Sequence, residues 1–291
     1  MKKWKAVLLT LPLLLFTACG STEGSGNVSD TSDSEALPQV TESVDTEGED
    51  NTESSENNNN TEEANDTQSE EHEVKPIDYE IDPTKPVIAL TFDDGPNTTT
   101  TNQVLDLLDK YQVRASFFLI GDNINDESAK SVKRAYDMGC EINNHSKTHS
   151  YMNKMTAEEI KAEVDYVSEK VKEITGEGTA FFRPPYIAVD STMYDNIDMP
   201  FISGYGCNDW EDKVTVERRL KTLRRYIADG IIILLHDVQG NDKTVEMLDT
   251  LIPELLEEGY QFVTVSELFE AKGVEISGED TNLYNEVPAA Q

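Results

Sequence analysis

Basic residues, cysteines and long apolar runs are scarce in this sequence of 291 residues. Lysine and arginine together number 24 against 57 aspartates and glutamates, which gives a net charge of −33 at pH 7. This excess of acid argues against nucleic acid or anionic lipid as a partner, because both repel an acidic surface. No apolar run is long enough to cross a bilayer. No repeat recurs at the spacing of a solenoid, and no pattern indicates an oligomeric state.

Residues 1–19 are typical of a bacterial secretion signal, in which a short basic segment precedes an apolar run and small residues close it. The tetrapeptide from Phe16 to Cys19 resembles a lipobox, with Phe16 where leucine is usual. We expect Cys19 to be lipidated and to anchor the protein at the outer face of the bacterial cell membrane. The alternative is an ordinary cleaved signal with a chance cysteine.

Residues 20–75 contain 17 acidic residues, one basic residue and no aromatic residue. Such a segment cannot bury enough apolar surface to offset its ordering entropy, so we expect a disordered, extended acidic linker. Residues 76–272 are sufficient for one domain with a well-buried core. Residues 273–291 show no period, and we expect a loose polar tail.

Short apolar runs alternate with longer amphipathic ones throughout residues 76–272. This rhythm predicts βα units and a parallel sheet, and the number of strands indicates a deformed (β/α) barrel of about seven strands, an α/β fold. The predicted strands begin at Val87, Ala115, Cys140, Ala180, Phe201, Ile231 and Gln261. The predicted helices span residues 100–111, 127–139, 156–174, 215–230 and 243–259.

Chemically reactive side chains follow the predicted strands, where the catalytic site of a βα barrel lies. They are Asp93, Asp94, His145, Arg183, Asp209 and His236. Of the four histidines, only His72 lies outside the predicted domain, in the acidic linker. We therefore expect the candidate site at the C-terminal ends of the strands.

Asp93 and Asp94 end the first strand as two adjacent carboxylates, which repel each other unless a cation or hydrogen-bond donors lie between them. His145 and His149 are spaced so that both imidazoles can reach one ion, although two hydrogen-bonded loop histidines give the same pattern. Together with Asp94 they supply two nitrogens and one carboxylate, which leaves coordination positions open for water and substrate. This set predicts a catalytic metal.

Five motifs occur in a fixed order, and together they resemble the polysaccharide deacetylase family, carbohydrate esterase family 4, also called the NodB-homology domain. The motifs are "TFDDGP", "HSKTH", "RPPY", "NDW" and "LLH". The resemblance covers residues 76–272. It implies a deformed (β/α) barrel that removes N-acetyl or O-acetyl groups from sugars with a divalent metal, commonly zinc, with cobalt or another divalent ion as alternatives.

The resemblance also implies a role for each motif residue. Asp94, His145 and His149 would bind the metal. Asp93 would be the general base, oriented by Arg183. His236 would be the general acid, paired with Asp209. The backbone N–H of Tyr186 would bind the oxyanion, while Trp210 and Leu234 would line a pocket for the acetyl methyl group or, alternatively, pack in the core.

Two residues depart from the family pattern: Ile187 stands where glycine is frequent, and Gly206 stands where aspartate is frequent. Neither change removes a proposed ligand, base or acid. We further expect Cys140 and Cys207 to be free, buried thiols, because the predicted strand order places them at opposite ends of the barrel, too far apart for a disulfide.

Three classes of function compete. A peptidoglycan N-acetylglucosamine deacetylase that confers lysozyme resistance is favoured, because the motif residues are present together and a lipid-anchored enzyme acts on its own envelope. A chitooligosaccharide deacetylase or an acetylxylan esterase would share every motif. A non-catalytic glycan-binding domain would have no reason to carry Asp93 and His236 together.

Overall fold

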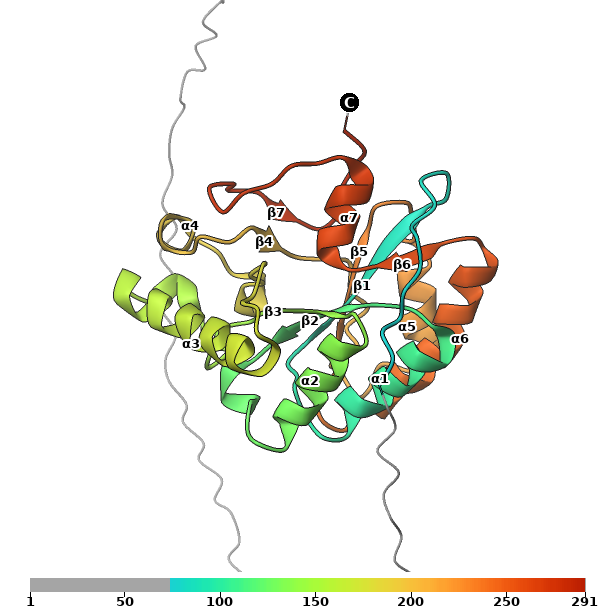
Figure 1. Ribbon diagram of the computed structural model, residues 1–291, viewed down its shortest axis with the longest axis horizontal. Helices are drawn as coiled ribbons and strands as arrows, with labels where there is room; N and C mark the ends of the chain where they lie inside the picture. Colours follow the sequence, from blue (N-terminus) through green and yellow to red (C-terminus); the bar gives the residue numbers. More distant parts are fainter. Residues whose placement is uncertain (1–73, 291) are drawn as a thin grey trace, which may run out of the picture. The chain divides into compact units, whose positions relative to one another are not determined.

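The computed structural model describes residues 74–290, which form a parallel sheet with helices around it (Figure 1). The predicted signal segment, Cys19 and nearly all of the predicted linker, with His72, lie outside the described residues. The strands are β1 (Val87–Asp93), β2 (Ser116–Leu119), β3 (Glu141–Asn144), β4 (Phe201–Ile202), β5 (Ile232–His236), β6 (Gln261–Val263) and β7 (Leu283–Tyr284).

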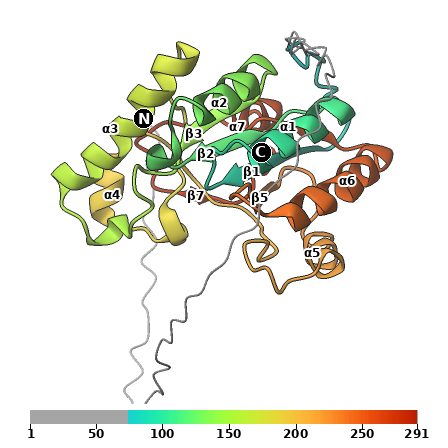
Figure 2. The same ribbon diagram turned by 90° about the horizontal axis from the view of Figure 1, so that it is seen from below.

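Helices connect successive strands and lie on the outside of the sheet, as the two views show (Figures 1 and 2). The α-helices are α1 (Thr100–Tyr111), α2 (Ser128–Asp137), α3 (Ala157–Thr175), α4 (Ser191–Asn196), α5 (Val216–Leu223), α6 (Asp242–Glu257) and α7 (Val265–Lys272). The short 3₁₀ helices are η1 (Gly121–Asn123), η2 (Met152–Lys154) and η3 (Pro185–Ile187). Helix α1 packs against α6, and α2 packs against α3.

Strand β1 is the centre of the sheet, in the order β3-β2-β1-β5. Its seven residues are all buried, as expected for a parallel strand that is covered on both faces. The first half of β1 pairs with β6 and the second half with β2, while β5 pairs along the other edge. All of these pairings are parallel. The sheet therefore has the parallel character that the sequence predicts.

Isolated bridges close the sheet into an irregular ring. Phe182 pairs with Asn144 at the end of β3 and with Phe201 in β4, and Tyr205 pairs with Ile233 in β5. The predicted strand from Ala180 therefore contributes a single bridge residue. Because three pairings in the ring are isolated bridges, the barrel is deformed. Strand β6 lies outside the ring, beside the start of β1.

Local sequence signals account for helix α3. Thr156 and Glu159 form a capping box at its start, and Gly176, with φ of 87°, ends it. Its buried side chains recur at helical spacing on one face: Ile160, Val164, Val167 and Val171. The other predicted helix ends at Gly139 and Gly259 also have positive φ. Helix α5 ends at Leu223, earlier than the sequence predicts, because its hydrogen bonds tighten into turns at residues 225–226.

The C-terminal residues up to 290 are not loose, in contrast to the prediction. Strand β7 pairs in parallel with β4, and the backbone N–H of Ile232 in β5 donates to Asn285. Val287 is fully buried, and its N–H donates to the carbonyl of Gly230 at 2.7 Å. The apolar residues of this segment are few, which hides its packing in the sequence, but Tyr284 and Val287 share a hydrophobic cluster with Ile202 in β4 and Ile232 in β5.

Cys140 and Cys207 are free and buried, which confirms the predicted absence of a disulfide between them. Burial raises the pKa of each thiol to about 12, so neither is a reactive thiolate at neutral pH. Within residues 74–290, no helix is both long and apolar enough to span a bilayer.

Candidate active site

The predicted site residues converge at the C-terminal ends of the strands. Asp93 is the last residue of β1 and pairs in register with His236, the last residue of β5. His145 directly follows β3, and Arg183 directly follows the bridge residue Phe182. The strand ends therefore bring together side chains that lie up to 143 residues apart in the sequence.

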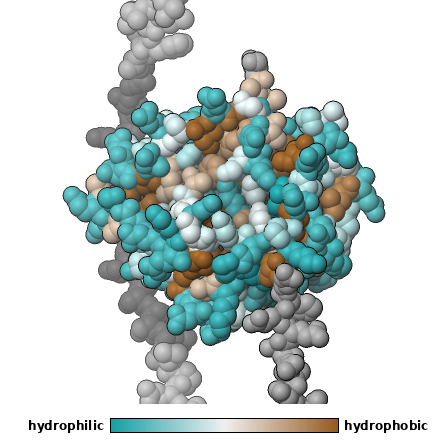
Figure 3. Space-filling model, in the orientation of Figure 1, coloured by the Kyte–Doolittle hydropathy of each residue, from teal (hydrophilic) through white to brown (hydrophobic). Residues whose placement is uncertain are grey.

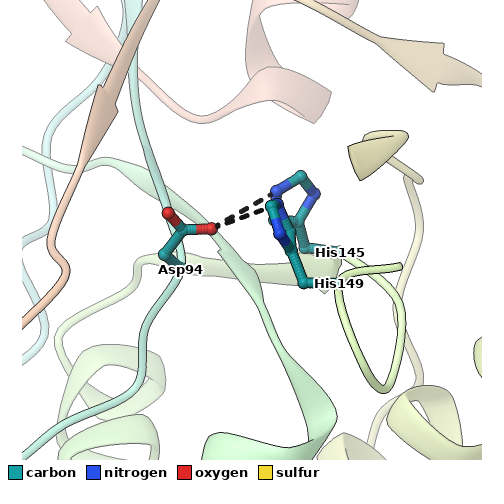
Figure 4. A group of neighbouring side chains, drawn as sticks. All are labelled: Asp94, His145 and His149. Carbon is teal, nitrogen blue, oxygen red and sulfur yellow. Dashed lines mark ion pairs between the residues drawn. The ribbon is translucent and has the colours of Figure 1, made fainter. Parts of the chain in front are cut away.

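Asp94, His145 and His149 form one cluster, drawn in Figure 4. One ligand atom from each residue lies within 4.8 Å of the others. The Nε2 atoms of His145 and His149 lie 3.6 Å and 3.5 Å from Oδ1 of Asp94. The two rings and the carboxylate point toward a common centre (Figure 4).

The donor set of this cluster fits a divalent metal ion. Nδ1 of His145 lies 2.7 Å from the carbonyl oxygen of Arg183, so it carries the proton and leaves Nε2 with its lone pair toward Asp94. Burial, and secondly the nearby His145, lower the pKa of His149, which keeps this imidazole neutral as a ligand must be. Oδ1 of Asp94 is buried and has no hydrogen-bond partner, as expected of an atom reserved for a cation.

Asp93 forms a buried ion pair with Arg183. Nη1 of Arg183 lies 2.5 Å from Oδ1 of Asp93, and the two residues are 0% and 2% exposed. Burial alone would raise the pKa of Asp93, but the charge of Arg183, helped by His145 and His236, lowers it below the usual value. Asp93 is therefore ionised at neutral pH.

Arg183 is itself held in place on two sides. Nη2 donates to the carbonyl of Ser203 at 2.8 Å, and the guanidinium lies 4.0 Å from the ring centroid of Phe118. The pair of Arg183 with Asp93 is not a surface ion pair, because Arg183 has no exposed area. The ion pair with Arg183 fixes the orientation of the Asp93 carboxylate. Its second oxygen, Oδ2, lies 3.7 Å from Nε2 of His145.

His236 pairs with the buried Asp209. Nδ1 of His236 lies 2.8 Å from Oδ1 of Asp209, whose Oδ2 accepts from the backbone N–H of His236 at 2.8 Å and from Thr244 at 2.9 Å. Burial lowers the pKa of His236, but the hydrogen bond and charge of Asp209, with Asp93 and Asp94, outweigh it and raise the pKa to about 9. His236 is thus protonated at neutral pH.

Aromatic rings border the cluster on the solvent side. Tyr186 is 54% exposed with its ring centroid 4.6 Å from that of His149, and Trp210 is 54% exposed with its ring 5.4 Å from that of His236. Core packing is therefore excluded for Trp210. Leu234, in contrast, is buried in β5.

The two departures from the motif pattern have structural counterparts. Ile187 has φ of 55°, next to Tyr186 with φ of 58°, so a β-branched residue occupies the left-handed region that favours glycine. A Cβ atom at Gly206 would lie 3.2 Å from the carbonyl oxygen of Leu234, so an aspartate there would crowd β5.

Two residues at the site were not predicted from the sequence. Tyr151 stacks on Tyr186 with ring centroids 4.1 Å apart. Asp237 is fully buried beside Gly95, and burial raises its pKa to about 7, although a hydrogen bond from Thr101 opposes this. The sequence signal for Asp237 was its position directly after His236, since polar residues at strand ends line such sites.

Comparisons with known proteins place these observations in a family. The protein family described as "Polysaccharide deacetylase" matches residues 80–199 of this chain. A bifunctional xylanase/deacetylase of Pseudobutyrivibrio xylanivorans is 53% identical over 65% of this chain and 31% of its own length. A peptidoglycan-N-acetylglucosamine deacetylase of Bacillus cereus is 34% identical over 69% of this chain and 97% of its own length.

Solved structures share the fold. The Xyl-CE4 domain of a multidomain xylanase from the hindgut metagenome of Trinervitermes trinervoides is 48% identical, with a TM-score of 0.67, over 69% of this chain and 98% of that domain. A family 4 acetyl xylan esterase from Clostridium thermocellum, in complex with a cobalt ion, is 41% identical with a TM-score of 0.68, over 69% and 99%. The chain spans less than half the length of several curated relatives, from 31% to 43%. With a relative matched over nearly its whole length, the chain belongs to the polysaccharide deacetylase family.

Proposed function

We propose that this protein hydrolyses acetyl groups from polysaccharides with a divalent metal ion bound by Asp94, His145 and His149. The observation that carries the proposal is the arrangement of an ionised carboxylate, Asp93, and a protonated imidazole, His236, around this ligand cluster. Such a pair can take a proton at the start of a hydrolysis and return one at its end.

The ion, zinc in our proposal, would lower the pKa of a bound water molecule and polarise the acetyl carbonyl. Asp93 accepts the proton of the attacking water through its Oδ2 atom, because Arg183 occupies Oδ1. The ion pair keeps this carboxylate ionised and fixes its direction. The backbone N–H of Tyr186 donates to the oxygen that gains negative charge.

His236 donates a proton to the leaving group. A sugar amine is a very poor leaving group as an anion. A sugar hydroxyl leaves somewhat more readily as its anion but is still a poor leaving group, so both require this proton. Nδ1 is engaged by Asp209, which leaves Nε2 to carry the transferred proton. Trp210 and Leu234 form the apolar wall for the acetyl methyl group.

O-acetylated xylan is the first substrate class to test. The relatives that are 53% and 48% identical to this chain over the matched residues are a bifunctional xylanase/deacetylase and a domain of a multidomain xylanase. The peptidoglycan-N-acetylglucosamine deacetylase of Bacillus cereus described above is 34% identical to this chain. The exposed rings of Tyr151, Tyr186 and Trp210 suit a sugar chain, since aromatic side chains offer apolar area together with a polar edge.

Peptidoglycan N-acetylglucosamine is the second candidate, and the expected lipid anchor at Cys19 favours it. A protein held at the outer face of the bacterial membrane lies beside its own cell wall. Removal of the acetyl group would leave a cationic amine there and reduce lysozyme binding. Lipidation and this location are proposals that depend on residues outside the described part of the chain.

One assay separates these substrates. The metal-loaded protein is incubated in parallel with acetylated xylan, N-acetylglucosamine oligomers and peptidoglycan, and released acetate is measured, with an Asp93→Asn variant as the inactive control. The highest rate on acetylated xylan supports the first class, and the highest rate on the amide substrates supports the second. Absence of acetate release from every substrate by the metal-loaded wild type would overturn the proposed function.

A further inference from the structure

The loop between the two histidine ligands has an unusual backbone. Ser146 and His149 both have positive φ, 66° and 56°, a conformation that non-glycine residues seldom adopt. Such residues persist only where surrounding contacts determine them. The position of the His149 ring therefore depends on what holds this loop.

The first half of the loop is fixed by the barrel. The N–H of Ser146 donates to the side chain of Asn144 at 3.0 Å, and the Ser146 carbonyl accepts from Gly121 at 3.0 Å. The Lys147 carbonyl accepts from Asp122 at 2.9 Å. These contacts hold the loop up to Lys147, and the hydroxyl of Ser146 also accepts from the N–H of His149 at 3.0 Å.

The second half is attached to helix α3 through one side chain, Glu163. Its Oε2 accepts from the backbone N–H of Thr148 at 2.8 Å, and the hydroxyl of Thr148 lies 3.0 Å and 3.1 Å from the two carboxylate oxygens. Glu163 lies between the buried residues Ile160 and Val167 in sequence and is adjacent to the buried Val164, so its helix is anchored in the core.

Glu163 contacts neither the ligand cluster nor the exposed aromatic rings. Its bonds end at Thr148, the residue directly before His149. A carboxylate that binds both the N–H and the hydroxyl of Thr148 restricts the Lys147–Thr148 peptide and the Thr148 side chain, directly before the ligand. Residues that hydrogen-bond a metal ligand commonly change metal affinity about 10- to 100-fold when they are mutated, and Glu163 holds the residue next to the ligand.

We propose that Glu163 is a positioning residue that fixes the His149 ligand by holding Thr148, and so sets the affinity of the site for a divalent ion. The inference rests on the metal site of the proposed function. It assigns Glu163 no contact with substrate or reacting atoms.

Metal affinity of the full chain, measured by competition with a chelator for Co²⁺ and Zn²⁺, tests this role. Glu163→Ala should weaken binding about 10-fold or more and change the absorption spectrum of bound Co²⁺, because His149 is less well placed. Glu163→Gln should remain near the wild type, since its amide can accept from the Thr148 N–H and donate to the Thr148 hydroxyl.

Two variants of the same helix are matched controls. Glu169→Ala removes an exposed carboxylate from α3, and Glu159→Ala removes the capping box and destabilises the helix start without touching the loop. Both should bind Co²⁺ with wild-type affinity and spectrum.

Wild-type affinity and spectrum in Glu163→Ala would overturn the inference. An equal loss in Glu159→Ala would also overturn it, because the effect would then come from general loosening of α3. Failure of the wild-type chain to bind either ion would overturn the metal site itself, and this outcome is distinct from a selective loss in one variant.

Discussion

The pair of Asp209 and His236 leads to a prediction about pH. His236 has a pKa of about 9 in place of 6.5, and Asp209 is the main cause of the rise. A general acid acts in its protonated form, so activity on a sugar substrate should be retained below the folded pKa and lost as the pH rises through it. A cation bound at Asp94 cancels part of that carboxylate's charge, so the alkaline limb should lie at or somewhat below pH 9.

Asp209→Asn removes the charge but keeps an amide next to the imidazole. At pH 8 a histidine with a pKa of 9 is about 90% protonated, whereas one with the ordinary value is about 3% protonated. In the variant, burial still lowers the pKa of His236 and only the smaller effects of Asp93 and Asp94 oppose it, so the pKa should fall to the ordinary value or below. We expect kcat/KM on an acetylated oligosaccharide at pH 8 to fall about 30-fold or more, and to fall less at pH 6.

The assay is a profile of kcat/KM from pH 5 to 10 for the wild type and the variant. An aryl acetate is measured in parallel, because its phenolate leaves without a proton and should be nearly insensitive to the change. Asp212→Asn, an exposed aspartate in the same loop, is the matched control. An alkaline limb at the wild-type position in Asp209→Asn, with an equal loss at every pH, would refute the reasoning.

Further predictions concern the base, the metal and the thiols. Asp93→Asn should keep its metal content and lose about 10²- to 10⁴-fold in turnover; a near-native acetate release rate would remove Asp93 as the base. His145→Ala should lose metal and activity together, and full metal content by elemental analysis would contradict this ligand. Cys140 and Cys207 should resist a thiol reagent at pH 8 in the native protein, and both should react after denaturation without reductant, in addition to Cys19 where it is unmodified. No reaction of these two after denaturation would mean that they are bridged.

Periodicity and caps in the sequence predict most of the fold. The strands from Val87, Ala115, Cys140, Phe201, Ile231 and Gln261 and the parallel pairing of the sheet are confirmed. Short elements were missed where the local pattern is weak. Helix α7 has the capping box of Thr264 and Glu267, a sequence signal that could have revealed it, whereas β7 is two residues long and depends on its contact with β4.

The candidate site could be predicted as far as its motif residues. Adjacent carboxylates and closely spaced histidines at strand ends are visible in the sequence, and the structure places them together. Tyr151 and Glu163 could not be found in this way. The stack of Tyr151 on Tyr186 depends on the approach of η3, and the bond of Glu163 to Thr148 depends on the approach of α3 to the histidine loop. Their local patterns are those of an ordinary surface tyrosine and an ordinary helical glutamate.

The central position of β1 also affects how the chain must fold while it is being made. Ala89 is hydrogen-bonded between β5 and β6, and its partner Ile232 is 143 residues further along the chain. At a synthesis rate of about 5 to 20 residues per second, this apolar strand waits about 7 to 30 s for that neighbour. During this time the edge of β1 that pairs with β5 is open to other chains, which is a hazard for aggregation. The barrel cannot close until translation of the domain is nearly complete, so a delay between synthesis and folding is built into its topology.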